Sequence, residues 1–258
     1  SNLLRNADVA VGLFSIGPSD VVFGGLPLFH SFGQTCGLNA AIACGAQLSL
    51  MQRFDPAAAL SQLECDDVTI FEGVPTMYVG LLNHRFHDRY DLAQLRLAVS
   101  GGAALPDEVL SGFEAAFDCV VLEGYGLSET SPIASFNHPG RERKPGSIGT
   151  PVEGVEMKLV DERGGEITPG EVGEIAIRGH NVMKGYWGAP DATAEAIDGD
   201  GWFKTGDTAR VDDDGYFYIV DRKNPPASAI DAPAKSDSPA RPVGVHARLT
   251  RWTGVPPE

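Results

Sequence analysis

The 258-residue chain carries 35 acidic and 20 basic residues, a formal net charge of -15, and 43% of its residues are hydrophobic. This acidity argues against a nucleic-acid binder, which needs a basic face to neutralise phosphates. No run of about 18 apolar residues occurs, so we expect no transmembrane segment. The length allows one large or two ordinary domains with a sizeable core.

Cysteine usage and the first residues bear on the cellular setting. The four cysteines, Cys36, Cys44, Cys65 and Cys119, form no C-x-x-C pair. This spacing favours small thiols in a reduced, cytoplasmic setting over disulfides or a metal site, both of which stay open. The chain opens SNLLRNADVA, without an initiator Met or a signal-peptide pattern, and we expect it to begin inside a longer protein.

Residues 1 to about 18 begin with a helical pattern, and from about residue 20 to residue 124 short apolar runs alternate with helical stretches. A helix is expected before Gly17-Pro18, and another begins at the N-cap pair Asp55-Pro56. Strands are expected in VVFGGLPLF, VTIFEGVP, LRLAVS and CVVLEGYG, with helices between them. Such alternation predicts an α/β fold with a parallel sheet and helices on both faces. Ligands bind at the carboxyl ends of such strands, here GVPT, SGGA and EGYGLSET.

The pattern changes after about residue 146. From Ser147 to Gly179, apolar and polar residues alternate between Gly and Pro turns, and DGYFYIVDR adds a strand after an Asp-Gly turn. This predicts a small antiparallel β-barrel-like subdomain. Residues 225–258 hold seven of the 18 prolines and one aromatic residue, Trp252, so we expect a disordered tail.

EGYGLSETSP, Glu123 to Pro132, is the sharpest local motif. Glycines such as Gly126 let the backbone approach a ligand. Tyr125 offers a flat face for a base, Ser128 a hydroxyl for a phosphate, and Glu129 a carboxylate for Mg²⁺. The alternative is a strand-to-loop turn with an exposed acid. A serine hydrolase is excluded because Thr130 stands where G-x-S-x-G needs glycine.

Three further motifs have competing interpretations. In GWFKTGD, Asp207 is placed either to accept hydrogen bonds from two ribose hydroxyls or to cap a turn. PLFHSFG, which contains His30, is either a pocket gate or, as we favour, a packed core loop. His84 and His87 have no third ligand close in sequence, which favours a solvated helix end over a metal site.

Seven segments together decide between these interpretations. In order they are PLFHSFG, FEGVPTMY, SGGAALP, EGYGLSETSP, KPGSIGTP, GEIAIRGHNVMKGYW and DGWFKTGDTARVDDDGYFYIVDR. Over about residues 1–223 the chain resembles the adenylate-forming (AMP-binding) superfamily, and most closely its long-chain fatty-acyl-CoA ligases. The resemblance implies ATP, Mg²⁺ and coenzyme A as cofactor and cosubstrates, and a fatty acid or other carboxylate as substrate. It implies attack of the carboxylate on the α-phosphate, followed by displacement of AMP by coenzyme A.

The resemblance also implies roles for individual residues. Tyr125 and Gly126 correspond to the adenine site, Ser128 to the α-phosphate contact, Glu129 to the Mg²⁺ carboxylate and Asp207 to the ribose-binding acid. Arg222 corresponds to an arginine that reaches the ribose and phosphate. A wall shared by the adenine and acyl pockets corresponds to Gly101, Gly102 and Ala103, and the acyl pocket to His30, Thr76 and Gly102.

Domain boundaries follow from the same resemblance. We expect residues 1–18 to end a preceding αβ subdomain, residues 19–140 to form the αβ subdomain with the acyl and adenine pocket, and residues 141–223 to form the β-rich subdomain. The family's phosphate loop would precede Ser1, and its mobile C-terminal domain would follow a hinge at Asn224. Residues 224–258 bear no resemblance to that domain, and we expect them to be disordered or translated out of frame. A reading of the coding DNA that finds no such domain in another frame would contradict the frame hypothesis.

Two other functions remain open from the sequence. The chain could be a non-catalytic acyl- or nucleotide-binding module, or another adenylate-forming enzyme such as an aryl-CoA ligase. The residues around Val74–Met77 and Gly101–Ala103 would discriminate between alkyl and aryl substrates. Acyl chain length and oligomeric state are beyond the sequence.

The missing phosphate loop and C-terminal lysine generate a first prediction. We expect the purified 258-residue chain to form little or no acyl-CoA from a fatty acid, ATP and coenzyme A, because the groups that stabilise the phosphoryl charge are incomplete. A thioester-formation assay on the purified chain measures this. Robust turnover would contradict it.

Overall fold

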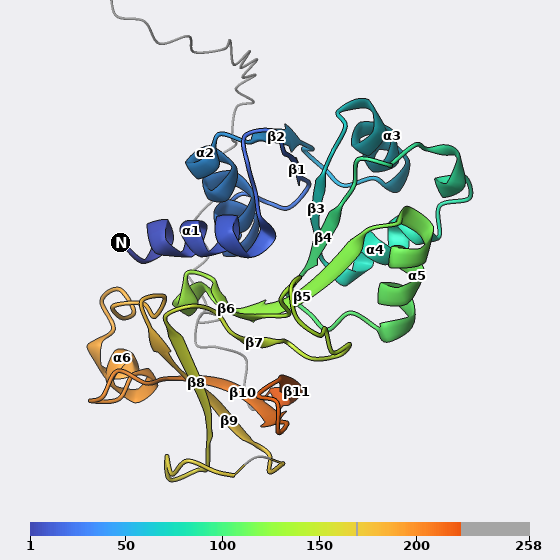
Figure 1. Ribbon diagram of the computed structural model, residues 1–258. Coiled ribbons are helices and arrows are strands. Elements are labelled where there is room, and N and C mark those ends of the chain that lie inside the picture. Colours follow the sequence, from blue (N-terminus) through green and yellow to red (C-terminus); the bar gives the residue numbers. More distant parts are fainter. Residues whose placement is uncertain (169, 223–258) are drawn as a thin grey trace, which may run out of the picture. The chain divides into compact units, whose positions relative to one another are not determined.

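The computed structural model describes residues 1–168 and 170–222 (Figure 1). The α-helices of this part are α1 (Asn2–Phe14), α2 (Ala40–Cys44), α3 (Pro56–Cys65), α4 (Pro75–Leu82), α5 (Asp107–Phe117) and α6 (Pro190–Ala196), with a π-helical segment η1 (Gly33–Asn39) and 3₁₀ turns η2 (His87–Arg89) and η3 (Ser128–Thr130). The strands are β1 (Val21–Gly24), β2 (Gln47–Leu50), β3 (Ile70–Gly73), β4 (Leu97–Ser100), β5 (Val120–Gly126), β6 (Ile133–Phe136), β7 (Thr150–Pro151), β8 (Val155–Val160), β9 (Gly173–Gly179), β10 (Phe203–Val211) and β11 (Phe217–Arg222).

The larger sheet has the strand order β2-β1-β3-β4-β5-β6-β7. Its first five strands are parallel, which confirms the predicted α/β fold. The last two pairings, β5 with β6 and β6 with β7, are antiparallel and were not expected. A parallel pairing needs a crossover of roughly a dozen residues. The connection from Gly126 to Ile133 is too short for that, so β6 turns back along β5.

Helices cover both faces of the parallel strands, and adjacent residues of β3 show why (Figure 1). Side chains alternate between the faces of a strand. Phe71 lies toward α4 and α5, with its ring centroid 5.2 Å from that of Tyr78 and 5.8 Å from that of Phe113. Glu72 lies toward η1, close to Gly37. Near-continuous apolar strands therefore bury both faces, as the sequence pattern predicts.

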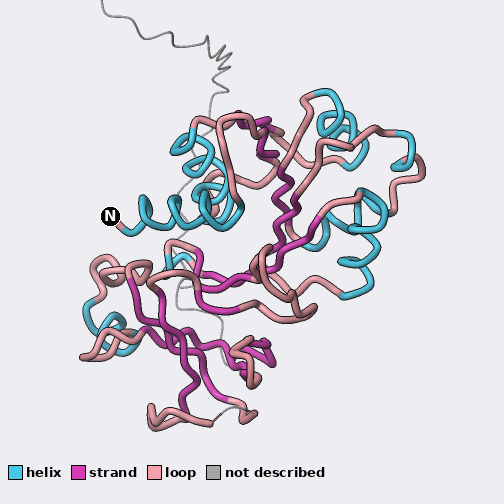
Figure 2. The backbone as a smooth tube through the Cα atoms, viewed as in Figure 1, coloured by secondary structure: helices cyan, strands magenta, loops and turns pink. Residues whose placement is uncertain are grey.

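The second sheet is antiparallel, with the order β11-β10-β9-β8. It confirms the predicted β-rich subdomain, and Figure 2 shows that residues 150–222 are mostly strand and loop. The β10 strand is irregular where it passes β9: Lys204 pairs with Ala176, but the next paired residue is Thr208, opposite Glu174. The extra residues form a bulge, a feature that re-aims side chains.

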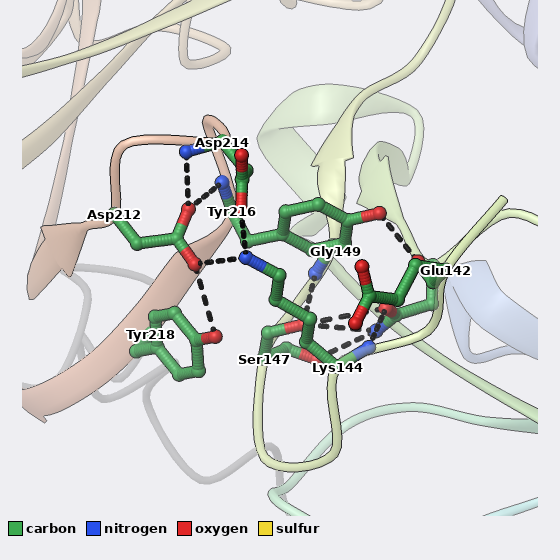
Figure 3. A network of polar contacts seen from close by, with 9 residues as sticks. Glu142, Lys144, Ser147, Gly149, Asp212, Asp214, Tyr216 and Tyr218 are labelled. Atoms are coloured by element: carbon green, nitrogen blue, oxygen red, sulfur yellow. Dashed lines mark hydrogen bonds and ion pairs between the residues drawn. The ribbon is translucent and has the colours of Figure 1, made fainter.

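A network around Lys144 joins the β10–β11 hairpin to the loop after β6 (Figure 3). The Lys144 ammonium donates to Asp212 at 2.8 Å and to Asp214 at 2.5 Å, and lies 4.7 Å from the ring centroid of Tyr216. The two aspartates raise the pKa of Lys144 above its usual range, so it stays charged. Backbone bonds between Ile148–Gly149 and Phe217 reinforce the junction.

The predictions for residues 224–258 and for the side chain of Arg222 lie outside the described residues. The backbone of Arg222 is described and ends β11. None of the helices described is both long and apolar enough to cross a bilayer.

The most unusual buried group is the carboxyl of Glu72. The residue is 1% exposed, and its Oε1 has no hydrogen-bond partner among the described residues. Burial raises its pKa from the usual 4.5 to about 8, so the side chain is largely neutral near pH 7. Gly37 makes room for it, because a Cβ there would lie 3.0 Å from Oε2. Burial raises the pKa of the neighbouring Cys36 thiol, and repulsion from the Glu72 carboxylate raises it further.

We expect Glu72→Gln to stabilise the protein at pH 7–8 but not near pH 4.5. Below pH 4.5 the carboxyl is protonated whether the chain is folded or unfolded. Between 4.5 and 8 only the unfolded chain releases the proton, so each pH unit lowers the free energy of unfolding by about 1.4 kcal/mol. Above pH 8 the loss is constant.

Urea unfolding at pH 5 and pH 8 measures the difference between the two proteins. Glu195→Gln, on the exposed surface of α6, is the matched control. Parallel pH profiles for wild type and Glu72→Gln would contradict the expectation.

Candidate nucleotide and acyl site

The loop from Gly126 to Pro132, between β5 and β6, carries three of the predicted nucleotide residues, Gly126, Ser128 and Glu129. Its tight path requires glycine at its start, since a Cβ on Gly126 would lie 2.1 Å from the carbonyl oxygen of Pro132. Thr130 closes the loop from inside: its hydroxyl accepts the N–H of Leu127 at 2.9 Å and donates to the carbonyl of Pro132 at 2.5 Å. The backbone of the loop is therefore held by its own residues.

Buried amide side chains attach this loop to distant parts of the chain. Asn6 of α1, fully buried, accepts the N–H of Ile133 at 2.9 Å and donates to its carbonyl at 3.1 Å. Asn181, also fully buried, donates to the same carbonyl at 2.9 Å. The backbone carbonyl of Asn181 accepts a hydrogen bond from the Ser131 hydroxyl at 2.8 Å. The loop is thus fixed between α1 and the segment that follows β9.

Within the loop, Ser128 is exposed and Glu129 is buried, with 7% of its surface accessible. The Tyr186 hydroxyl donates to Oε1 of Glu129 at 3.1 Å, and the N–H of Met183 donates to the Glu129 carbonyl at 2.8 Å. Burial and the adjacent carboxylate raise the pKa of Tyr186 to about 12, so the phenol remains a donor. These contacts fix the direction of the Glu129 carboxylate.

Tyr125, at the end of β5, meets Asp207 of β10. The tyrosine hydroxyl donates to Oδ2 of Asp207 at 2.5 Å. Asp207 lies in the bulge of β10 with 6% of its surface exposed, and its N–H donates to the Thr205 hydroxyl at 3.1 Å. Gly206 before it has φ +76°, a left-handed conformation that glycine adopts without strain. The residues predicted for the base and for the ribose are therefore in direct contact.

An open cavity of about 890 Å³ lies at the carboxyl ends of β1 and β3. This volume is toward the upper end of the roughly 300–1,000 Å³ of small-molecule sites. Its polar side chains are His30, Gln52 and Arg53. The rest of the lining is apolar or glycine: Gly24, Gly25, Leu26, Pro27, Leu28, Phe29, Phe32, Leu50, Met51, Phe54, Val74, Met77 and Gly102.

Ser31 connects the cavity to the loop. Its hydroxyl lies 3.5 Å from that of Ser128, while its neighbours His30 and Phe32 line the cavity. The backbone N–H of Phe32 donates to Nδ1 of His30 at 3.3 Å, which orients the ring. The contact places the chain segment that lines the cavity through His30 and Phe32 next to a hydroxyl predicted to contact phosphate.

The remaining predicted pocket residues differ in their positions. Gly102 lines the cavity with φ +82°, and Gly101 packs against Phe32, whose ring would be 3.2 Å from an added Cβ. Ala103 is exposed and does not line the cavity. Thr76 is also exposed, and its neighbour Met77 lines the cavity instead.

Comparison with known proteins decides the family. The sequence pattern of the family described as AMP-binding enzyme matches residues 1–187. The chain belongs to the AMP-binding enzyme family. This confirms the resemblance seen in the sequence.

Several relatives of this chain are CoA ligases. It is 41% identical over 225 residues to a long-chain-fatty-acid–CoA ligase of Bacillus subtilis, covering 86% of this chain and 40% of the relative. It is also 41% identical to a feruloyl-CoA synthase of an Amycolatopsis species, covering 76% and 40%. The structure of ATP-bound MatB from Rhodopseudomonas palustris superposes with a TM-score of 0.81 at 32% identity, covering 86% and 44%. The chain thus spans about 40% of the length of the curated relatives it matches.

The sequence did not predict the residues that position the loop from Gly126 to Pro132. They are Asn2, Asn6, Ser31, Asn181 and Tyr186. Asparagine has a low helix propensity, so its presence inside a predicted helix, as at Asn6, indicates that its side chain bonds elsewhere. This signal could not have named Ile133 as the partner, 127 residues away.

We expect Asn6→Ala to lower the free energy of unfolding by about 2–4 kcal/mol, because it leaves the buried N–H of Ile133 without its partner and weakens the bonding of its carbonyl. Urea unfolding monitored by circular dichroism measures the change. Asn83→Ala, at an exposed position after α4, is the control and should shift the midpoint little. Equal effects of the two substitutions would show that the Asn6 contacts do not stabilise the loop.

Proposed function

We propose that this chain supplies the acyl pocket and part of the nucleotide site of an enzyme that activates a fatty acid with ATP to an acyl-adenylate and passes the acyl group to coenzyme A. In the first step a carboxylate oxygen attacks the α-phosphorus, the bond from that phosphorus to the bridging oxygen breaks, and pyrophosphate leaves. In the second step the thiol sulfur bonds to the acyl carbon, the carbon–oxygen bond to AMP breaks, and AMP leaves. The observation that carries the proposal is the mostly apolar cavity whose lining segment, from Gly24 to Phe32, also contacts the Ser128 loop through Ser31.

The site residues have separate roles in this proposal. The ring of Tyr125 faces the adenine, Asp207 binds the ribose hydroxyls, and the Ser128 hydroxyl contacts the α-phosphate. His30 and Gly102 border the acyl chain where it enters the cavity. Arg222, at the end of β11, is proposed to reach the ribose and phosphate.

Glu129 is the proposed Mg²⁺ carboxylate. Mg²⁺ is usually held by few protein carboxylates together with phosphate oxygens and water. A single oriented carboxylate fits this, and among the described residues no group of His, Cys, Asp and Glu forms a protein cage for a metal. When bound, the ion would neutralise phosphate charge, while the protein's own part is to hold the carboxylate through Tyr186.

Aliphatic and aromatic substrates are the two candidates for the cavity. The volume and the leucine, methionine and phenylalanine lining support a flexible alkyl chain. The equal identity to a feruloyl-CoA synthase favours an aromatic acid as the second candidate. Both share the adenylate chemistry and differ only in what fills the cavity.

The proposal is tested by calorimetric titration of the 258-residue chain with AMP and with non-hydrolysable acyl-sulfamoyl adenosines. We expect the palmitoyl compound to bind at least about 100-fold more tightly than AMP and than the benzoyl compound, since burial of each methylene contributes about 0.8 kcal/mol. Ser128→Ala should weaken AMP binding by about tenfold, and Ser111→Ala on the exposed side of α5 should not.

Each other outcome has a defined meaning. Tighter binding of the benzoyl compound would replace the fatty acid by an aromatic acid. Failure of the chain to bind AMP or either adenylate analogue would contradict the proposed site.

A further inference from the structure

The hydroxyl of Tyr125 performs a task that its ring cannot. It donates to Oδ2 of Asp207 at 2.5 Å, and both residues are at least half-buried. Hydroxyl-to-carboxylate bonds of about 2.5–2.7 Å are charge-assisted and roughly twice as strong as neutral ones. Phenylalanine or tryptophan would offer a base the same kind of flat face, but neither could make this bond.

Tyr125 itself is well anchored. Its backbone pairs with Ser135 of β6, and the Ser135 hydroxyl donates to the carbonyl of Ile148 at 2.8 Å. Gly124 before it packs closely on Phe136, whose ring would be 2.2 Å from an added Cβ. The tyrosine hydroxyl is therefore a fixed reference point on the larger sheet.

The backbone at Asp207 is more irregular than that at Tyr125: β5 shifts its register against β6 by one residue after Tyr125, whereas β10 is unpaired with β9 between Lys204 and Thr208. Asp207 belongs to the bulge in which β10 loses its register with β9, beside Gly206 in the left-handed region. A bond to Oδ2 from a fixed donor sets the plane of the carboxylate, and with it the direction of Oδ1. Two adjacent ribose hydroxyls require both oxygens of one carboxylate at a defined orientation.

We propose that Tyr125 is a positioning residue whose hydroxyl orients Asp207 for the 2′- and 3′-hydroxyls of the ribose. The inference rests on the proposed nucleotide site and goes beyond the contact of the tyrosine ring with the base. Removing the hydroxyl weakens recognition of the ribose and leaves recognition of the base intact.

Calorimetry with AMP and 2′,3′-dideoxy-AMP separates the two contributions of Tyr125. Wild type binds AMP about tenfold or more tightly than the dideoxy compound, because the latter lacks both hydroxyls. Tyr125→Phe lowers the affinity for AMP by about tenfold and leaves that for dideoxy-AMP unchanged, so the ribose preference is lost. Asp207→Asn loses the same preference, and the double variant binds AMP no more weakly than Asp207→Asn alone.

Tyr218→Phe is the matched control. Tyr218 lies in β11, and its hydroxyl also donates to an aspartate, Oδ2 of Asp212 directly after β10, at 3.2 Å. This variant keeps the full preference for AMP. Thermal unfolding followed by circular dichroism checks that all variants fold. If Tyr125→Phe does not fold, Tyr125→Trp provides another aromatic ring without the hydroxyl.

Three results would overturn the inference. Equal losses for AMP and dideoxy-AMP in Tyr125→Phe would mean that the hydroxyl acts on the fold or the base, not through Asp207. An unchanged ribose preference in that variant would mean that Asp207 needs no such support. Wild type that binds AMP without preferring it to dideoxy-AMP, or does not bind it, would remove the proposed nucleotide site together with the inference.

Discussion

The hydrogen bonds that Asn6 and Asn181 make to Ile133 hold the candidate site together. They satisfy a buried backbone amide at the point where the chain leaves the parallel strands and turns back as β6. Ser128 and Glu129 lie in the loop that this turn creates, so their positions depend on α1 and on the segment after β9. A buried amide group left unpaired is costly, which makes this arrangement strongly preferred over alternatives.

Tyrosine hydroxyls orient several carboxylates in this acidic chain. Tyr125 donates to Asp207, Tyr186 to Glu129 and Tyr218 to Asp212. A phenol fixes the direction of a carboxylate and leaves its negative charge in place. A lysine or arginine would neutralise that charge. Under the proposed function, Glu129 thereby stays available to a cation and Asp207 to ribose hydroxyls. Lys144 illustrates the other solution, in which a cation between two aspartates stabilises a hairpin.

Local elements follow from the sequence because they depend on neighbouring residues. Asp55 accepts the N–H of Ala58 at 2.9 Å with Pro56 in the first turn of α3, as the N-cap pattern predicts. The antiparallel pairing of β6 was not predicted, although the short connection after Gly126 excludes a crossover. The cavity shows the same limit: Met77 lines it and Thr76 does not, because the direction of each side chain depends on how α4 packs on the sheet.

The sequence by itself determined the α/β pattern, the later antiparallel strands, the glycines of the tight turns and the AMP-binding family. These features rest on periodicity, turn chemistry and motifs within short windows. Tertiary structure alone decided that Ser31 meets Ser128, that Tyr186 holds Glu129, and that the Tyr125 hydroxyl reaches Asp207, 82 residues away. Each of these contacts joins separate elements, so each exists only once the strands and helices have packed against one another.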